Sequence, residues 1–179
     1  MGDVLLDSGN PNAAGAKSAL ARDLIATSGQ SANVKADTKL AYRYNLARVA
    51  LAKHDRTTYE SEAASYASGA QAQHNAVRIR QAHELAGLIA LDERNFDLAV
   101  VEFKLANQQD PFVYYALARA YQGTGDTPKA RTWALAAANA NILPTLPSAF
   151  VRRKALKMVE SLRAQSSAVS GSPSRVPGR

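Results

Sequence analysis

The sequence predicts an all-α fold in which antiparallel helical hairpins stack side by side. Alanine dominates the hydrophobic residues, and the good helix formers Leu, Arg, Lys, Gln and Glu are plentiful. Only four Phe and one Trp are present, whereas sheets are enriched in aromatic and β-branched residues. Apolar residues recur at spacings of three and four, which marks one face of an amphipathic helix. These observations together favour helices that pack closely through small side chains.

The helical pattern is clearest between Arg80 and Asn141. An apolar stripe at 85–89 ends at a polar break, and a second stripe at 96–106 ends before Asp110-Pro111. The same sequence of stripe, break and stripe then repeats, with Gly125 in the break. Glycine tolerates the positive φ that often ends a helix. A hairpin of this size cannot bury its apolar stripe alone, so we expect successive hairpins to stack.

Two successive units, at 75–110 and 111–141, resemble the tetratricopeptide repeat, a helical hairpin of about 34 residues. With Arg80 as position 1, small or aromatic residues stand at positions 8, 20, 24 and 27 of the repeat. With Pro111 as position 1 of the next unit, the residues at positions 8, 11, 15 and 20 also match those of the repeat. Trp133 lies next to the position at which a large aromatic residue is usual. The residues expected at packing positions of the repeat are Ala47, Gly87, Ala99, Phe103, Ala106, Ala118, Tyr121, Gly125, Ala130 and Trp133.

The resemblance implies a right-handed superhelix of antiparallel hairpins, a tetratricopeptide-like α-solenoid. A degenerate third hairpin is expected at 38–69, and residues 147–165 are expected to form a capping helix. Polar connectors are expected at Gln30–Asp37 and Ser68–Gln73, and a disordered basic tail at 166–179. Residues 1–29 match a partial first repeat that lacks its first six residues. This suggests either the C-terminal portion of a longer array or a chain with an irregular first turn.

Catalytic motifs are absent from the sequence. His54, His74 and His83 stand alone, and the residue three after Glu84 is Gly87, so the His-Glu-x-x-His zinc motif is not formed. The glycines at 123 and 125 are not followed by the Gly-Lys-Ser of a phosphate loop. No cysteine is present, which excludes disulfides and thiolate metal sites. We therefore expect a protein that is not an enzyme and that uses no metal or cofactor.

The resemblance further implies that the first helix of each hairpin lines a concave groove. Tyr44 and Arg48 then recur as Tyr115 and Arg119, one helical turn apart in each case. Tyrosine and arginine are frequent anchors of protein interfaces. Either pair alone favours ordinary packing of an arginine stem over a ring, and the recurrence of the pair makes the two interpretations about equal. The expected partner is a protein or peptide. The candidate groove residues are Tyr44, Arg48, Gln81, Glu84, Leu88, Phe112, Tyr115, Arg119 and Gln122.

The net charge of +7 leaves nucleic-acid binding as a weaker alternative. Residues 146–179 carry seven basic residues and one acidic residue, so residues 1–145 contribute only +1. A basic terminal segment more often aids solubility or makes loose acidic contacts than forms a specific nucleic-acid site. A purely structural role, as the end of a larger repeat protein, is the other alternative.

Targeting signals and membrane segments are not visible in the sequence. No apolar run approaches the ~20 residues that span a bilayer, and residues 1–20 lack the pattern of a signal peptide. The alanine-rich composition is typical of bacterial proteins, and the lack of cysteine fits either cytoplasm or periplasm. The compartment and the oligomeric state stay open.

Overall fold

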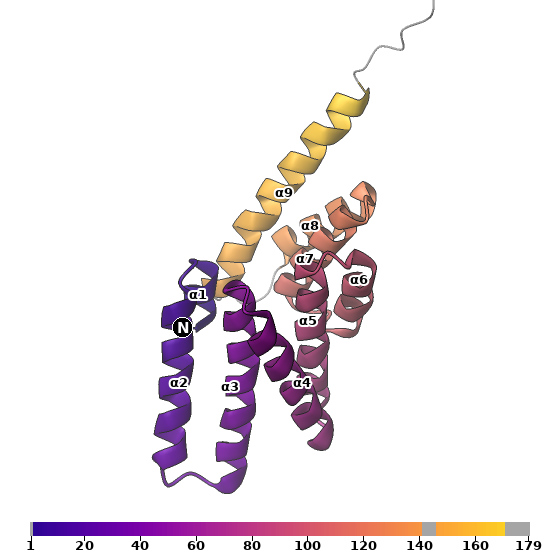
Figure 1. The fold of residues 1–179 in the computed structure, drawn as a ribbon. Coiled ribbons are helices and arrows are strands. Elements are labelled where there is room, and N and C mark those ends of the chain that lie inside the picture. The colour runs from indigo at the N-terminus through magenta and orange to yellow at the C-terminus, as the bar shows by residue number, and fades with distance from the viewer. Residues whose placement is uncertain (1, 141–145, 171–179) are drawn as a thin grey trace, which may run out of the picture.

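A computed structural model describes residues 2–140 and 146–170, and these residues confirm the expected all-α class. They form nine helices and no strand, and neighbouring helices along the chain pack against one another (Figure 1). The helices are α1 (Gly2–Asp7), α2 (Pro11–Thr27), α3 (Ala32–Ala52), α4 (Arg56–Ala72), α5 (Ala76–Asp92), α6 (Phe96–Leu105), α7 (Pro111–Gly123), α8 (Thr127–Asn139) and α9 (Leu146–Ser170).

The helices form two rows. Among the described residues, α1, α3, α5, α7 and α9 each contact the next odd-numbered helix, whereas no two even-numbered helices touch. The odd-numbered helices therefore form one continuous row, and each even-numbered helix covers its neighbours on the other side. The first helix also contacts the last, so the row returns on itself, and Figure 1 shows the beginning of α9 beside α1 while its far end stands clear of the other helices.

The main core lies between α5 and α9 and is built from close contacts between small and large side chains. Phe103 of α6 is fully buried and lies against Gly87 of α5, where an added Cβ would come within 2.7 Å of the ring. Leu117 and Ala118 of α7 are fully buried beside it in the same cluster. Small residues at the expected packing positions thus let large neighbours approach the helix backbone. A second cluster joins α3, α4 and α5 around Tyr66, which is fully buried.

One turn occurs five times among residues 2–140 and 146–170. At each copy a residue with positive φ ends one helix, and the next residue, Asn or Asp, begins the following helix as its N-cap. The amide of each cap residue also donates to the carbonyl five residues earlier, as in a Schellman motif. The turns are Gly9-Asn10, His54-Asp55, His74-Asn75, Arg94-Asn95 and Gly125-Asp126.

The pKa of the two aspartate caps in these turns is lowered by the hydrogen bonds that they accept. Hydrogen bonds from the side chain and amide of Thr58 lower the pKa of Asp55, and those from Lys129 lower the pKa of Asp126. Because the pKa is lower in the folded state than in the unfolded chain, the charged cap stabilises the fold at pH values above the ordinary pKa of about 4. This stabilisation is lost as the pH falls through the pKa of the folded state.

In three of the five turns, the residue with positive φ is not glycine, and replacing it should change the stability of the fold. Arg94 has φ of 61°, and an L-residue in this region costs roughly 1–2 kcal/mol. We expect Arg94→Gly to raise the free energy of unfolding by up to about 1 kcal/mol, because the greater freedom of glycine in the unfolded chain offsets part of the gain. Gly125→Ala, at φ of 82°, should lower it by about 1 kcal/mol. Urea unfolding followed by circular dichroism measures both changes, and equal losses in the two variants would contradict the prediction.

Some expected boundaries are wrong. Most of the expected connector at Gln30–Asp37 is the first part of α3, which is capped by Ser31 and has no Gly or Pro to interrupt it. Most of Ser68–Gln73 is likewise the end of α4. The expected capping helix at 147–165 is α9, which continues to Ser170, so residues 166–170 are helical and not part of a disordered tail. The rest of the expected tail, 171–179, lies outside the described residues, as does residue 141 of the last hairpin.

Candidate functional site

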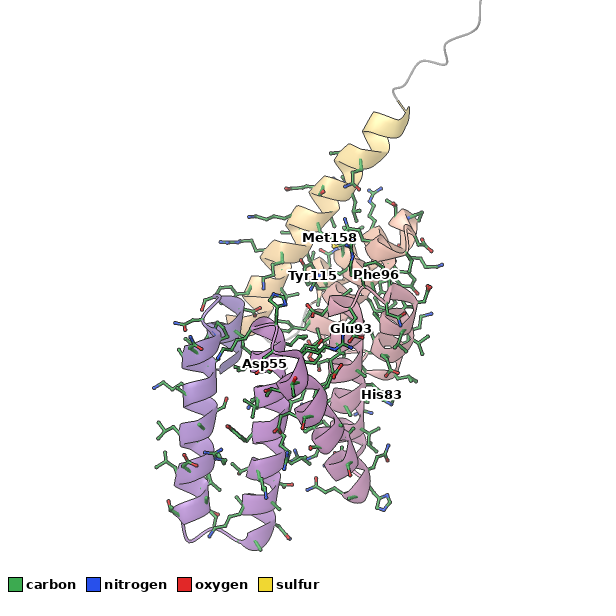
Figure 2. The ribbon with its side chains drawn as sticks, in the orientation of Figure 1. Asp55, His83, Glu93, Phe96, Tyr115 and Met158 are labelled. Atoms are coloured by element: carbon green, nitrogen blue, oxygen red, sulfur yellow. The ribbon has the colours of Figure 1, made fainter. Side chains whose placement is uncertain are left out.

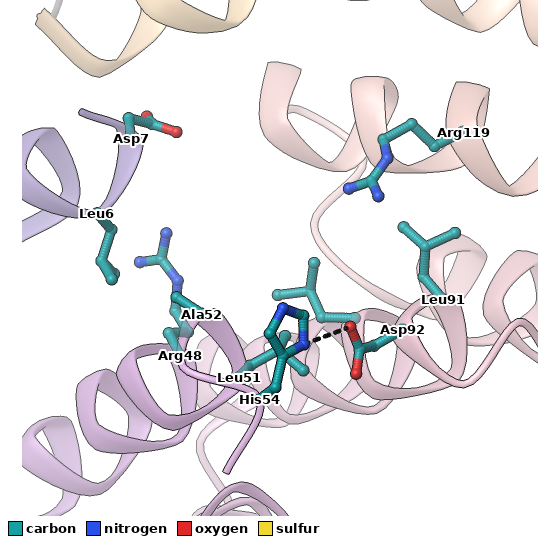
Figure 3. A pocket seen from close by; sticks show the side chains of 10 residues that line it. Leu6, Asp7, Arg48, Leu51, Ala52, His54, Leu91, Asp92 and Arg119 are labelled. Atoms are coloured by element: carbon teal, nitrogen blue, oxygen red, sulfur yellow. Dashed lines mark ion pairs between the residues drawn. The ribbon is translucent and has the colours of Figure 1, made fainter. Parts of the chain in front are cut away.

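A cavity of about 340 Å³ opens along the row of odd-numbered helices (Figure 3). This volume is at the small end of the range for ligand pockets, roughly 300–1,000 Å³. Its lining comes from α1, α3, α5, α7 and the turn after α3, so four hairpins contribute to it. The lining residues are Leu6, Asp7, Arg48, Leu51, Ala52, His54, Leu88, Leu91, Asp92 and Arg119.

The cavity brings together three of the nine candidate groove residues. Arg48, Leu88 and Arg119 come from three successive odd-numbered helices and line the same space. Leu51 and Leu91, which lie one turn after Arg48 and Leu88, add an apolar wall. At this point of the row, first helices of different hairpins therefore border one cavity.

Three other candidates form a network beside the cavity. The Tyr44 hydroxyl donates to Glu84 Oε1 at 2.9 Å, and its ring lies 5.3 Å from the ring of Tyr66, centroid to centroid. The Tyr66 hydroxyl donates to Gln81 Oε1 at 2.6 Å. The guanidinium of Arg48 lies 5.4 Å from the centre of the Tyr44 ring, within the range of a cation–π contact. This network joins α3, α4 and α5 and holds Arg48 at the edge of the cavity.

The remaining three candidates do not line the cavity. Phe112 and Tyr115 are half-buried and pack against the cluster that contains Val151 and Ala155 of α9, and Figure 2 shows Tyr115 near Met158. The α9 helix therefore covers the part of the row at which these two aromatic residues were expected to receive a partner. Gln122 is exposed at the end of α7.

The residues expected at packing positions lie mostly in the core. Trp133 is half-buried and its ring lies 5.5 Å from that of Tyr114. Gly125 is exposed and serves the turn. The others are all buried: Ala47, Gly87, Ala99, Phe103, Ala106, Ala118, Tyr121 and Ala130.

The two carboxylates of the cavity were not expected from the sequence. Asp7 Oδ1 accepts from Lys154 Nζ at 2.7 Å across 147 residues, which links α1 to α9. Asp7 Oδ2 is buried without a hydrogen-bond partner in the described structure. Asp92 faces His54, with 3.6 Å between Oδ1 and Nδ1. Neither contact has a signal in the sequence, because each depends on how distant hairpins stack.

The charged groups at the cavity balance one another. Arg48, Arg119 and Lys154 contribute three positive charges at or beside it, and Asp7, Asp92 and Glu84 contribute three negative charges. Arg119 is exposed and makes no ion pair with any described residue. Figure 3 shows Asp7 and Arg119 on opposite sides of the cavity.

The turns beside the cavity are tied together by charge. Arg56, at the start of α4, pairs with Glu93 after α5 at 2.7 Å. This ion pair connects two copies of the repeated turn, which follow α3 and α5, the helices that supply Arg48 and Leu88. Both side chains are at least partly exposed, so the pair itself contributes little stability, roughly 0–1 kcal/mol.

The described residues hold neither a metal-binding cluster nor a membrane-spanning helix. No group of three or more His, Cys, Asp or Glu side chains in that part of the chain is placed to hold a metal ion. None of its helices is both long and apolar enough to cross a membrane. Comparison with protein-family models, with curated proteins and with solved structures found no match to the chain.

Proposed function

We propose that the protein is a non-catalytic interaction scaffold that binds a peptide or protein segment on the concave side of a tetratricopeptide-like, right-handed superhelix. The observation that carries the proposal is the cavity in which Arg48, Leu88 and Arg119 of three successive hairpins meet. A surface shared by several repeats is how stacked hairpins bind partners. An apolar wall with a few charged groups at its edge suits a peptide side chain and its polar backbone.

The repeated turn supports the same proposal. Its five copies begin α2, α4, α5, α6 and α8, and they are 20 to 45 residues apart because one helix separates some consecutive copies and two helices separate others. The close approach of Phe103 to Gly87 joins an aromatic residue and a small residue at the packing positions that the resemblance implies. Both features concern how helices stack, and neither requires a catalytic group.

Removal of the two cavity arginines tests the proposal. We expect Arg48→Gln/Arg119→Gln bait to lose a protein that wild-type bait retains from the lysate of the source organism, because arginine anchors often dominate interfaces. Tyr44 and Tyr115 are left in place, since both pack against buried residues. Arg80→Gln/Arg131→Gln removes two exposed arginines that lie away from the cavity and is the matched control. Circular dichroism and thermal melting must show equal folding of all three baits.

A photo-crosslinking residue then locates the contact. Placed at Leu88 of the cavity, it should capture the same partner, and placed at Leu98, which is 43% exposed on α6, it should not. Identical captures by both arginine variants and by wild type would reject the cavity as the binding surface.

Nucleic-acid binding is a second candidate, which the surface of α9 favours. Arg152, Arg153 and Lys157 are exposed on this helix and make no ion pair with any described residue. Phosphate contacts by such side chains would weaken steeply with salt. Binding of a random-sequence duplex that survives Arg48→Gln/Arg119→Gln but is lost in Arg152→Gln/Arg153→Gln/Lys157→Gln would support this candidate over the scaffold.

A further inference from the structure

We infer that the segment bound in the cavity is acidic: a carboxylate of the partner pairs with Arg119 while an adjacent apolar side chain lies against the leucines. This inference rests on the proposed function, because it names the chemistry of the partner at the same site. It follows from which charged groups of the cavity already have partners and from the leucines that line it.

The carboxylates of the cavity are both engaged. Asp7 holds Lys154 at 2.7 Å, and Asp92 faces His54 at 3.6 Å. A basic group of a partner would have to compete with Lys154 for Asp7, whose side chain is only 14% exposed. Oδ2 of Asp7 accepts no hydrogen bond from a described residue but is buried, so a cationic ligand would reach this carboxylate only in place of Lys154.

The arginines differ from each other. Arg48 is half-buried and stands over the Tyr44 ring, so it is held by the protein. Arg119 is exposed on the opposite helix and makes no ion pair within the described part of the chain. Its guanidinium presents a fork of N–H donors that matches a carboxylate. Among the charged side chains that line the cavity, Arg119 can therefore receive a carboxylate of a partner without breaking an ion pair of the protein.

The apolar wall sets the second requirement. Leu51, Leu88 and Leu91 lie on two neighbouring helices and line the cavity together with Leu6. A fully hydrophilic anion such as inorganic phosphate would leave these leucine side chains in contact with water. An acidic residue next to an apolar residue satisfies both the arginine and the leucines, which is why we assign an acidic peptide and not a free anion.

Three peptide pools test the assignment on the full chain. The pools contain fluorescein-labelled, C-terminally amidated heptapeptides with the same random apolar positions. They differ only at two polar positions, which hold Glu and Asp, Gln and Asn, or Lys and Arg. Fluorescence anisotropy should show at least about tenfold tighter binding of the acidic pool than of the amide pool, as a charge-assisted hydrogen bond provides. Arg119→Gln should remove that difference, and Arg131→Gln on α8 should leave it intact. Inorganic phosphate at millimolar concentration should not displace the acidic pool.

The outcomes separate this inference from the scaffold proposal. Equal binding of the acidic and amide pools, preference for the basic pool, no binding of the acidic pool, or an unchanged preference in Arg119→Gln overturns the acidic assignment. Displacement by phosphate at low concentration overturns it as well and identifies an anion site. In all these cases a lysate partner that crosslinks at Leu88 would still support the scaffold proposal. The scaffold proposal itself would be rejected if Arg48→Gln/Arg119→Gln bait captured that partner as well as wild-type bait does.

Discussion

Replacing Phe103 with alanine is expected to lower the free energy of unfolding by about 3–5 kcal/mol, the usual cost of removing a buried phenylalanine from a packed core. The ring has no exposed surface and fills the space between α5 and α6 next to Gly87. No side chain at Gly87 can replace the lost contacts, so the cavity that remains would collapse only partly. Urea unfolding at neutral pH measures the change, and a loss below about 1 kcal/mol would show that the helices do not pack through this contact.

The opposite change at the same contact is a useful control. Gly87→Ala should cost about 1–3 kcal/mol, because its Cβ would come within 2.7 Å of the Phe103 ring, which has no free space to move into. Combining Gly87→Ala with Phe103→Leu should recover part of this loss. A double variant whose loss equals the sum of the single losses would show that the two residues act independently.

Tyr66→Ala is expected to have an effect of similar size, about 3–5 kcal/mol. Tyr66 is fully buried where α3, α4 and α5 meet, packs against Tyr44 and donates to Gln81. The variant should also weaken partner binding, since loss of this packing frees Tyr44 and with it Arg48. Denaturant unfolding and the acidic-peptide assay, carried out on the same protein, test the two effects separately.

Tyr66→Phe separates the ring from its hydroxyl. It should cost only about 0.5–1.5 kcal/mol at neutral pH, the net value of one hydrogen bond. Burial raises the pKa of Tyr66 above its ordinary value, so its neutral form stabilises the fold below about pH 10 and this contribution is lost as pH rises further. The difference between wild type and Tyr66→Phe should therefore shrink above pH 10. A difference that stays constant to pH 11 would contradict the burial of the hydroxyl.

Much of the local structure could be predicted from the sequence because its signals act over a few residues. The spacing of apolar residues predicted helices, and the breaks at Asp92–Asn95 and Gly123–Asp126 fell at turns. The positive φ of His54, His74 and Arg94 was not predicted, because non-glycine residues carry it. The recurring pair of such a residue and an Asn or Asp cap is the signal that could have revealed all five turns.

Connector boundaries were harder, since polar residues are ambiguous. Gln30–Asp37 contains no Gly or Pro, and several of its residues tolerate a helix. Once Ser31 caps α3, hydrogen bonding continues through this segment to the apolar part of the helix. Polarity alone therefore marked a connector where the helix merely faces solvent.

By itself, the sequence determined the helical class, most of the turns and the residues that pack between helices, because periodicity, capping and side-chain size are local properties. Only the tertiary structure decided which of these residues share a site. It placed Asp7 against Lys154, covered Phe112 and Tyr115 with α9, and gathered Arg48, Leu88 and Arg119 around one cavity. The physical reason is that small rotations between successive hairpins add up along the array. The meeting of its first and last helices therefore depends on every interface between them.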